Sequence, residues 1–236
     1  MKPPAERART GVFGGTFNPI HLGHLRAAEE VAELLELERV LFVPSAQPPH
    51  KRGDGEQVLA PAAERLAWVR LAIAGNPRFA VDALEIERSG PSYSVETLRA
   101  LAPRLAPERP VFVIGDDAFA DLATWREPEA LLALAHFAVL ARPPRRGGGL
   151  AELVPAALRA QLQLAPDGRS ARHRDAGTWL RLLEIGALDV SASEIRARLR
   201  AGRSVRYLLP EPVREAILRS GVYAAPRGAA ARTEAP

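Results

Sequence analysis

The sequence predicts an α/β protein: a Rossmann-like, doubly wound parallel sheet followed by C-terminal helices. Short apolar segments that suit strands alternate with longer segments of helical periodicity, the pattern of a parallel sheet covered on both faces. Residues 111–114 are apolar throughout, as in a strand buried from both sides. With 236 residues, 47% of them hydrophobic, the chain can bury a core without disulfides or structural metals.

The first half of the chain contains three strands and two helices by this pattern. A strand at 10–13 runs into two glycines, and the run at 40–43 is stopped by a proline. The elements predicted here, in order, are strand 10–13, helix 22–37, strand 40–43, helix 61–74 and strand 79–81. Ligands of such sheets bind beyond the carboxyl ends of the strands, so the loops after Gly14, Pro44 and Gly115 are the candidate site.

The second half continues the alternation and then changes character. The predicted elements are helix 94–101, strand 110–114, helix 128–135 and strand 137–140. Residues 142–149 then form a loop rich in proline, arginine and glycine, followed by a helical stretch to about Leu164 and a further polar loop. The composition of residues 1–9 predicts a flexible N-terminus, and that of residues 224–236 a disordered tail.

Composition excludes several classes of function. The chain has no cysteine, which rules out thiol nucleophiles, iron–sulfur clusters and zinc ribbons. No segment reads as a secretory signal or a membrane helix, so we expect a soluble, cytoplasmic protein with no membrane partner. The net charge of +4 gives weak support for a nucleic-acid partner, because the arginines are spread along the chain. Composition leaves open whether the protein is a homo-oligomer.

The segment GGTFNPIHLGH at residues 14–24 has the strongest chemical signature. It follows a strand and opens a helix, so its glycines and the helix N-terminus can approach an anion with backbone N–H groups. His21 and His24 are three residues apart and share one helix face, from which both can donate to phosphate oxygens. No serine or cysteine nucleophile lies beside them, so stabilisation of charge fits better than covalent catalysis.

This segment resembles the GGTFDPIHxGH signature of bacterial nicotinate-nucleotide adenylyltransferases, in the HxGH nucleotidyltransferase superfamily. Further segments resemble that family's motifs in the same order: VPSAQPPHK at 43–51, PSYSVETL at 91–98, IGDD at 114–117 with Leu122 and Trp125, VSASEIR at 190–196, and YLLPEPV at 207–213. The resemblance spans residues 10–223, predicted as a single nucleotidyltransferase domain in which 143–177 form a divergent, insertion-like region.

The resemblance implies transfer of AMP from ATP to nicotinate mononucleotide, with Mg²⁺ bound through the ATP phosphates and pyrophosphate released. The 5′-phosphate of the mononucleotide attacks the α-phosphorus directly, a step that needs positioning and charge neutralisation. It assigns catalysis to His21, His24 and Arg196. The residues it implies for ATP binding are Gly14, Gly15, Thr16, Phe17, His21, His24, Gly115, Asp116, Ser191, Ser193 and Arg196. Ser191 to Glu194 also form a capping box, which would leave that helix N-terminus free to meet phosphate.

For the mononucleotide the resemblance implies Asn18, Lys51, Ser94 and Trp125, with Trp125 stacked on the pyridine ring. By residue type alone, Trp125 would more often be a core aromatic and Lys51 a solvated loop charge. Asn18 replaces the family's usual aspartate, which removes a negative charge near the phosphates. Ser94 and Ser193 replace threonines and keep the hydroxyl.

Two other functions stay open at this point. An adenylyltransferase that prefers nicotinamide mononucleotide would carry the same motifs, because backbone donors and local charge at the ring pocket decide between acid and amide. A basic nucleotide- or RNA-binding protein is the alternative from another class, and intact His21, His24, Ser193 and Arg196 argue against it. Phosphopantetheine adenylyltransferases, a third relative, are shorter and lack the segments at 43–51 and 91–98.

Overall fold

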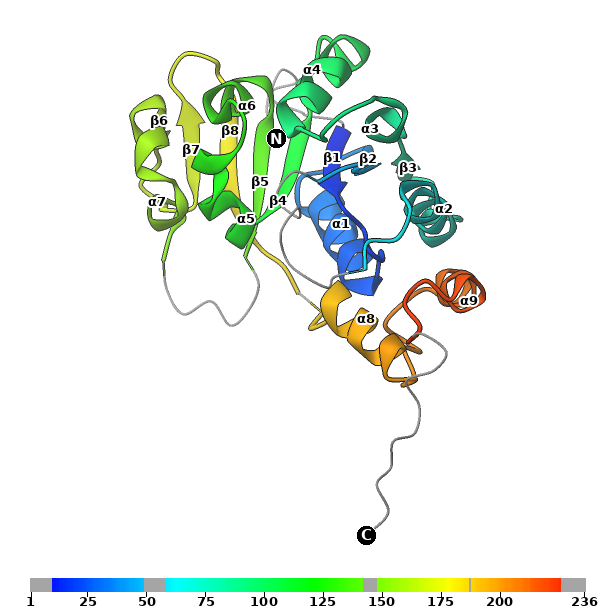
Figure 1. The fold of residues 1–236 in the computed structure, drawn as a ribbon. Coiled ribbons are helices and arrows are strands. Elements are labelled where there is room, and N and C mark those ends of the chain that lie inside the picture. The colour runs from blue at the N-terminus through cyan, green and yellow to red at the C-terminus, as the bar shows by residue number, and fades with distance from the viewer. Residues whose placement is uncertain (1–9, 49–57, 142–147, 187, 226–236) are drawn as a thin grey trace.

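The structure of the chain is a computed structural model that describes residues 10–48, 58–141, 148–186 and 188–225 (Figure 1). The predictions for the flexible N-terminus at 1–9 and for Lys51 lie outside the described residues, as do those for most of the C-terminal tail and for residues 143–147.

The described residues form one eight-stranded sheet in the order β3-β2-β1-β4-β5-β8-β7-β6. The parallel strands are β1 (Thr10–Gly15), β2 (Arg39–Pro44), β3 (Phe79–Val81), β4 (Val111–Gly115), β5 (His136–Ala141) and β8 (Trp179–Glu184). Strands β6 (Leu162–Leu164) and β7 (Ser170–His173) add an antiparallel edge. Chain order reverses between β1 and β4, and such a switch point opens a crevice at the carboxyl ends of the strands.

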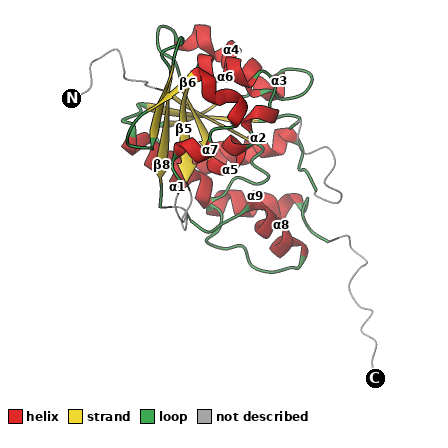
Figure 2. Ribbon diagram, turned by 90° about the vertical axis from the view of Figure 1, so that its left-hand side faces the viewer, coloured by secondary structure: helices red, strands yellow, loops and turns green. Residues whose placement is uncertain are grey.

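Helices cover both faces of the sheet, as expected for a doubly wound fold (Figure 2). One core packs against α1 (Leu22–Leu34), α2 (Ala62–Ile73), α8 (Ala192–Arg200) and α9 (Glu211–Ser220). The other packs against α4 (Ser94–Leu105), α5 (Asp116–Ala120), α6 (Pro128–Leu134) and α7 (Leu150–Leu153). The short helix α3 (Leu84–Glu87) and the 3₁₀ turns η3 (Leu122–Thr124) and η4 (Ala156–Gln161) lie in the connections. The α/β class and the C-terminal helices are confirmed.

Three local predictions were wrong. The stretch to Leu164 is helical only in the short elements α7 and η4, and it ends in strand β6. Leu162 pairs with His173 in a hairpin, a contact that hydrophobic periodicity along the sequence cannot predict. The sheet is therefore not parallel throughout. The helix expected over 22–37 stops at Leu34, because Glu36 adopts a left-handed backbone (φ +54°) and Leu37 turns into the core. Helix α4 runs on to Leu105.

The described residues include no helix with both the length and the apolar character needed to cross a membrane.

Candidate active site

Two cavities open at the carboxyl ends of the central strands, one associated with each face of the sheet. The first, which we call the histidine cavity, measures about 130 Å³ and is lined by His21, His24 and Gly115 among others. The second, which we call the tryptophan cavity, measures about 150 Å³ and is lined by Ser94 and Trp125 among others. Of the predicted site residues, the histidine cavity takes His21, His24 and Gly115, and the tryptophan cavity takes Gly14, Gly15, Thr16, Ser94 and Trp125. The predicted site residues within the described ranges that line neither of these two cavities are Phe17, Asn18, Asp116, Ser191, Ser193 and Arg196.

The end of β1 lies between the two cavities. Phe13 lines the histidine cavity, whereas Gly14, Gly15 and Thr16 line the tryptophan cavity. We call residues 14–16 the glycine bridge. A Cβ atom on Gly15 would lie 3.1 Å from the ring of Phe17, which is tighter than ordinary contacts. A side chain at this position would therefore push on the segment that separates the cavities.

Phe17 is held in a way the sequence did not predict. Its backbone is left-handed (φ +46°), which is unusual for a bulky residue, and its side chain is buried. The ring meets those of Phe13 and His24 edge to face, at centroid distances of 5.9 and 5.2 Å. The Phe17 side chain therefore packs against His24. Because this side chain is buried, a ligand would meet Phe17 through its backbone.

The two histidines are fixed by the start of α1. Their rings stack at a centroid distance of 3.7 Å, and the backbone N–H of His21 donates to Nδ1 of His24 at 3.2 Å. Because that nitrogen accepts, Nε2 is assigned as the N–H donor of His24. A Cβ atom on Gly23 would lie 3.1 Å from Nδ1 of His21, so a residue without a side chain is needed beside the stack. The spacing of the motif thus builds a preformed pair of imidazoles at the cavity wall.

Helix α8 brings a second helix N-terminus close to the histidines. Val190, which precedes the helix, lines the histidine cavity, and its carbonyl oxygen approaches Gly23. One of the two hydrogen bonds of the predicted capping box is present: Oγ of Ser191 accepts from the backbone N–H of Glu194 at 3.2 Å. The Glu194 carboxylate pairs with Arg198 instead of closing the box. Ser191 and Ser193 lie with their hydroxyls 3.1 Å apart on the exposed side of this turn.

Two buried arginines hold the loop after β1 from below. Arg196 on α8 donates from Nη1 to the carbonyl of Asn18 at 2.7 Å. Arg65 on α2 is fully buried and donates from Nη1 to the carbonyls of Thr16 at 2.7 Å and Ser45 at 2.6 Å. The remaining hydrogen bonds described for Arg65 also go to backbone carbonyls.

Arg65 was missed by sequence reasoning, since an arginine inside a helix usually indicates a solvated face. Burial lowers its pKa, yet a guanidinium keeps its charge inside proteins. A buried charge without a described carboxylate partner is costly, and here it is directed at the loops that follow β1 and β2. Arg65 therefore clamps both loops and adds positive potential beneath the glycine bridge.

The side chain of Asn18 lies away from both cavities. Its Oδ1 accepts from the backbone N–H of Ala60 at 3.0 Å and from the Tyr223 hydroxyl, and its Nδ2 donates to the carbonyl of Val58 at 2.9 Å. Tyr223 is buried, and burial raises the pKa of its hydroxyl, which keeps it a donor. An aspartate could not donate to Val58, so asparagine suits this position. Through these contacts Asn18 stabilises the loop after β1, and it does not line either cavity.

The two aspartates after β4, Asp116 and Asp117, differ in where their side chains lie. Oδ1 of Asp116 accepts from the backbone N–H of Asp117 at 3.0 Å, at the first turn of α5. Asp117, which the sequence did not single out, is the one that lines the histidine cavity. Position after Gly115 alone does not reveal which of two adjacent aspartates faces a cavity.

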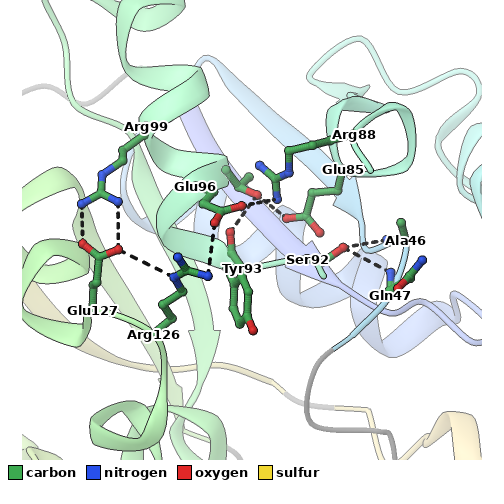
Figure 3. Close-up of polar contacts among 11 residues, drawn as sticks. Ala46, Gln47, Glu85, Arg88, Ser92, Tyr93, Glu96, Arg99, Arg126 and Glu127 are labelled. Atoms are coloured by element: carbon green, nitrogen blue, oxygen red, sulfur yellow. Dashed lines mark hydrogen bonds and ion pairs between the residues drawn. The ribbon is translucent and has the colours of Figure 1, made fainter. Parts of the chain in front are cut away.

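The tryptophan cavity has a charged rim that the sequence also did not predict. Trp125 directly follows η3 and meets Phe112 edge to face at a centroid distance of 6.3 Å, and Ser94 begins α4. Glu85 and Arg126 line the same cavity. Glu85 is buried, and burial raises the pKa of its carboxyl, partly offset by hydrogen bonds from Thr97 and Ser92. Ser92 accepts from the backbone N–H groups of Ala46 and Gln47, which ties the loop after β2 to this cavity (Figure 3).

Comparisons with known proteins agree with the fold and with the motifs. The model of the cytidylyltransferase-like family matches residues 12–198. A Geobacter sulfurreducens protein named "Probable nicotinate-nucleotide adenylyltransferase" is 43% identical over 92% of this chain and 98% of its own length. A protein of the same name from Symbiobacterium thermophilum is 45% identical over 92% of this chain and 95% of its own.

Among solved structures, a Plasmodium falciparum nicotinic acid mononucleotide adenylyltransferase complexed with NaAD has a similar fold. Its TM-score is 0.69 at 16% identity, covering 92% of this chain and 97% of that one. At this identity the likeness supports the fold alone. The family model and the relatives above 40% identity carry the assignment: this chain belongs to the cytidylyltransferase-like family.

Proposed function

We propose that this chain is a nicotinate-nucleotide adenylyltransferase, which transfers AMP from ATP to nicotinate mononucleotide in NAD biosynthesis. The names of the relatives above 40% identity support this reaction. The observation that carries it is the pair of cavities on either side of the glycine bridge, one walled by the stacked histidines and the other by Trp125. Two nucleotides held there would meet phosphate to phosphate.

In this proposal ATP occupies the histidine cavity, with the triphosphate at the N-termini of α1 and α8. His21, His24 and Arg196 neutralise the charge that develops on the transferred phosphoryl group. Backbone groups of Gly14, Gly15, Thr16 and Phe17 approach the nucleotide, with Gly115, Asp116, Ser191 and Ser193 completing the ATP site. Asp117 joins them because it lines the cavity. Arg65 is a positioning residue that acts through the carbonyls of Thr16 and Ser45.

The mononucleotide occupies the tryptophan cavity, with its pyridine ring on Trp125 and with Ser94 helping to bind the nicotinate end. Lys51, which lies outside the described residues, keeps the phosphate contact that the resemblance implies. Asn18 contributes by bracing the loop after β1. An oxygen of the 5′-phosphate attacks the α-phosphorus of ATP and forms the new P–O bond. The bond from the α-phosphorus to the bridging oxygen breaks, and pyrophosphate leaves with that oxygen.

We place Mg²⁺ on the ATP phosphates. The described residues contain no group of three or more histidine, cysteine, aspartate or glutamate side chains arranged to hold a metal ion. A Mg²⁺ ion bound through the triphosphate takes its ligands mainly from phosphate oxygens and water, so this mode of binding does not depend on such a group. When bound, the ion supplies further neutralisation of phosphate charge.

A nucleic-acid partner is disfavoured by how the surface charges are arranged. Many described arginines lie in ion pairs, including those of Arg26 with Glu30, Arg104 with Asp82 and Arg169 with Glu184. Intermixed charge of this kind differs from the basic stripe that tracks a phosphate backbone. We further propose that residues 10–223 act as one catalytic domain in the cytoplasm.

Pyrophosphate release in the presence of ATP and Mg²⁺ tests the proposal. We expect rapid release with nicotinate mononucleotide and slower release with nicotinamide mononucleotide. Release only with the amide would reassign the substrate. No release with either compound, together with salt-sensitive binding to RNA, would replace the enzyme with a nucleic-acid-binding protein.

A further inference from the structure

Arg126 lies beside the proposed pyridine site and has no role in the assignments so far. It directly follows Trp125, and it lines the same cavity as Trp125 and Ser94. Figure 3 shows that the side chain extends past the ring of Tyr93 toward Glu96. Arg126 is therefore a charged residue in the lining of the cavity that is proposed to hold the pyridine ring.

Contacts with described residues on three sides position the Arg126 guanidinium, and none of these three contacts is a close hydrogen bond. Its central carbon lies 4.7 Å from the centroid of the Tyr93 ring, a cation–π arrangement. Its nitrogens lie 3.6 Å from Glu96 and 3.8 Å from Glu127, both longer than a hydrogen bond. The guanidinium is therefore positioned, while its N–H groups can still form short bonds to a ligand.

The charges around Arg126 do not cancel. We define the arginine–glutamate cluster as Arg88, Glu96, Arg99, Arg126 and Glu127 (Figure 3). Arg99 holds Glu127 with two hydrogen bonds of 3.0 and 2.6 Å. Glu96 is shared, at 3.6 Å, between Arg88 and Arg126. The cluster as defined has three guanidinium groups and two carboxylates, an excess of one positive charge, and Arg126 is its member that lines the tryptophan cavity.

Glu85 does not oppose this charge as an open acceptor. It is the acidic residue that lines the cavity, but its carboxyl receives hydrogen bonds from Thr97 and Ser92. Burial also favours the neutral form of this carboxyl. The NH₂ group of a carboxamide on the pyridine ring would have to share the Glu85 carboxyl with Thr97 and Ser92. A carboxylate on the ring would instead accept hydrogen bonds from Arg126.

We propose that Arg126 determines specificity, by selecting the carboxylate of nicotinate mononucleotide over the carboxamide of nicotinamide mononucleotide. A guanidinium can donate two parallel hydrogen bonds to a carboxylate, and such charge-assisted bonds are about twice as strong as neutral ones. The inference rests on the proposed function and adds the residue that sets its substrate preference.

The test compares kcat/KM for the two mononucleotides in the wild type and in four variants. Arg126→Gln removes the charge and keeps much of the length, so we expect the acid-to-amide ratio to fall about tenfold, the effect of losing one charge-assisted bond. The change should arise from a higher KM for the acid, with the amide reaction and the KM for ATP unaltered. Arg219→Gln, an exposed change on α9, is the matched control and should leave the ratio unchanged.

The other variants separate charge from packing. Arg126→Lys keeps the charge and should retain most of the preference. Glu96→Gln enlarges the positive excess beside Arg126 and should raise the ratio. In the wild type the ratio should fall as salt is added, because the Arg126 side chain is half exposed and its charge is screened.

The outcomes distinguish this inference from the proposed function. If the wild type turns over neither mononucleotide, the proposed function fails. If the wild type prefers the acid and Arg126→Gln keeps that ratio, the assignment to Arg126 is overturned while the enzyme's reaction stands. Should Arg126→Gln lose its fold, Glu96→Gln decides, and an acid-to-amide ratio in Glu96→Gln no higher than that of the wild type would overturn the assignment.

Discussion

The two cavities are built in different ways. The histidine cavity depends on backbone geometry, because its imidazoles stack at the start of a helix and leave room only for glycine beside them. The tryptophan cavity depends on side-chain charge, with Glu85 and Arg126 in its lining and the arginine–glutamate cluster around Arg126. A site that stabilises a transition state needs rigid donors, whereas a site that distinguishes two similar rings needs local charge. Changes in the first cavity should therefore alter turnover, and changes in the second should alter substrate binding.

The largest effect is expected at His24. We predict that His24→Ala lowers kcat at least about a hundredfold with either mononucleotide, the usual scale for loss of one transition-state donor. Steady-state pyrophosphate release measures it. Nδ1 of His24 also accepts from the backbone N–H of His21 at the start of α1. His24→Asn is therefore the control, because its side-chain oxygen can accept this hydrogen bond without an imidazole. Near-normal turnover in the alanine variant would remove His24 from the reaction.

A smaller and more selective effect is expected at Trp125. Trp125→Ala should raise the KM for the mononucleotide about tenfold, in line with the loss of one ring stacked on a base. The KM for ATP should change little, because Trp125 does not line the histidine cavity. Trp125→Phe, which keeps an aromatic face, should recover most of the loss. Equal increases in both KM values would make Trp125 a packing residue and erase the distinction between the cavities.

The smallest effect concerns stability and pH at Glu85. Burial raises the pKa of Glu85 above its ordinary value of 4.5. As pH rises above that value the unfolded chain loses this proton first, so the folded state binds more protons and becomes less stable with pH until its own pKa is passed. Glu85→Gln lacks this dependence. Urea unfolding from about pH 4 to about pH 8 should show the wild type losing stability relative to the variant; parallel curves would contradict a raised pKa.

Much of the fold could be predicted because its signals are local. The apolar run at 111–114 and the glycines that follow Phe13 identify β4 and β1 without any tertiary information. The β6–β7 hairpin could not be found in this way, because the pairing of Leu162 with His173 is a contact between distant residues. Strand β8 (Trp179–Glu184) was missed for the same reason, since its place beside β5 is set by the sheet.

Candidate site residues could be named from the sequence where motifs carry them, and could not be named where burial decides. The spacing of His21 and His24 is visible in the sequence, and the structure places the two rings against each other. Nothing in the sequence distinguishes Arg65, which is fully buried, from the paired arginines of the surface. Arg126 likewise becomes a candidate only when the fold brings it to the wall of a cavity.

The most direct measurement of the central claim is a crystal structure of the chain with nicotinate adenine dinucleotide, the product of the proposed reaction. The account predicts that the adenosine half lies in the histidine cavity and the pyridine ring on Trp125, with the two phosphates crossing residues 14–16. A product bound entirely within one cavity, or with its halves exchanged, would contradict it.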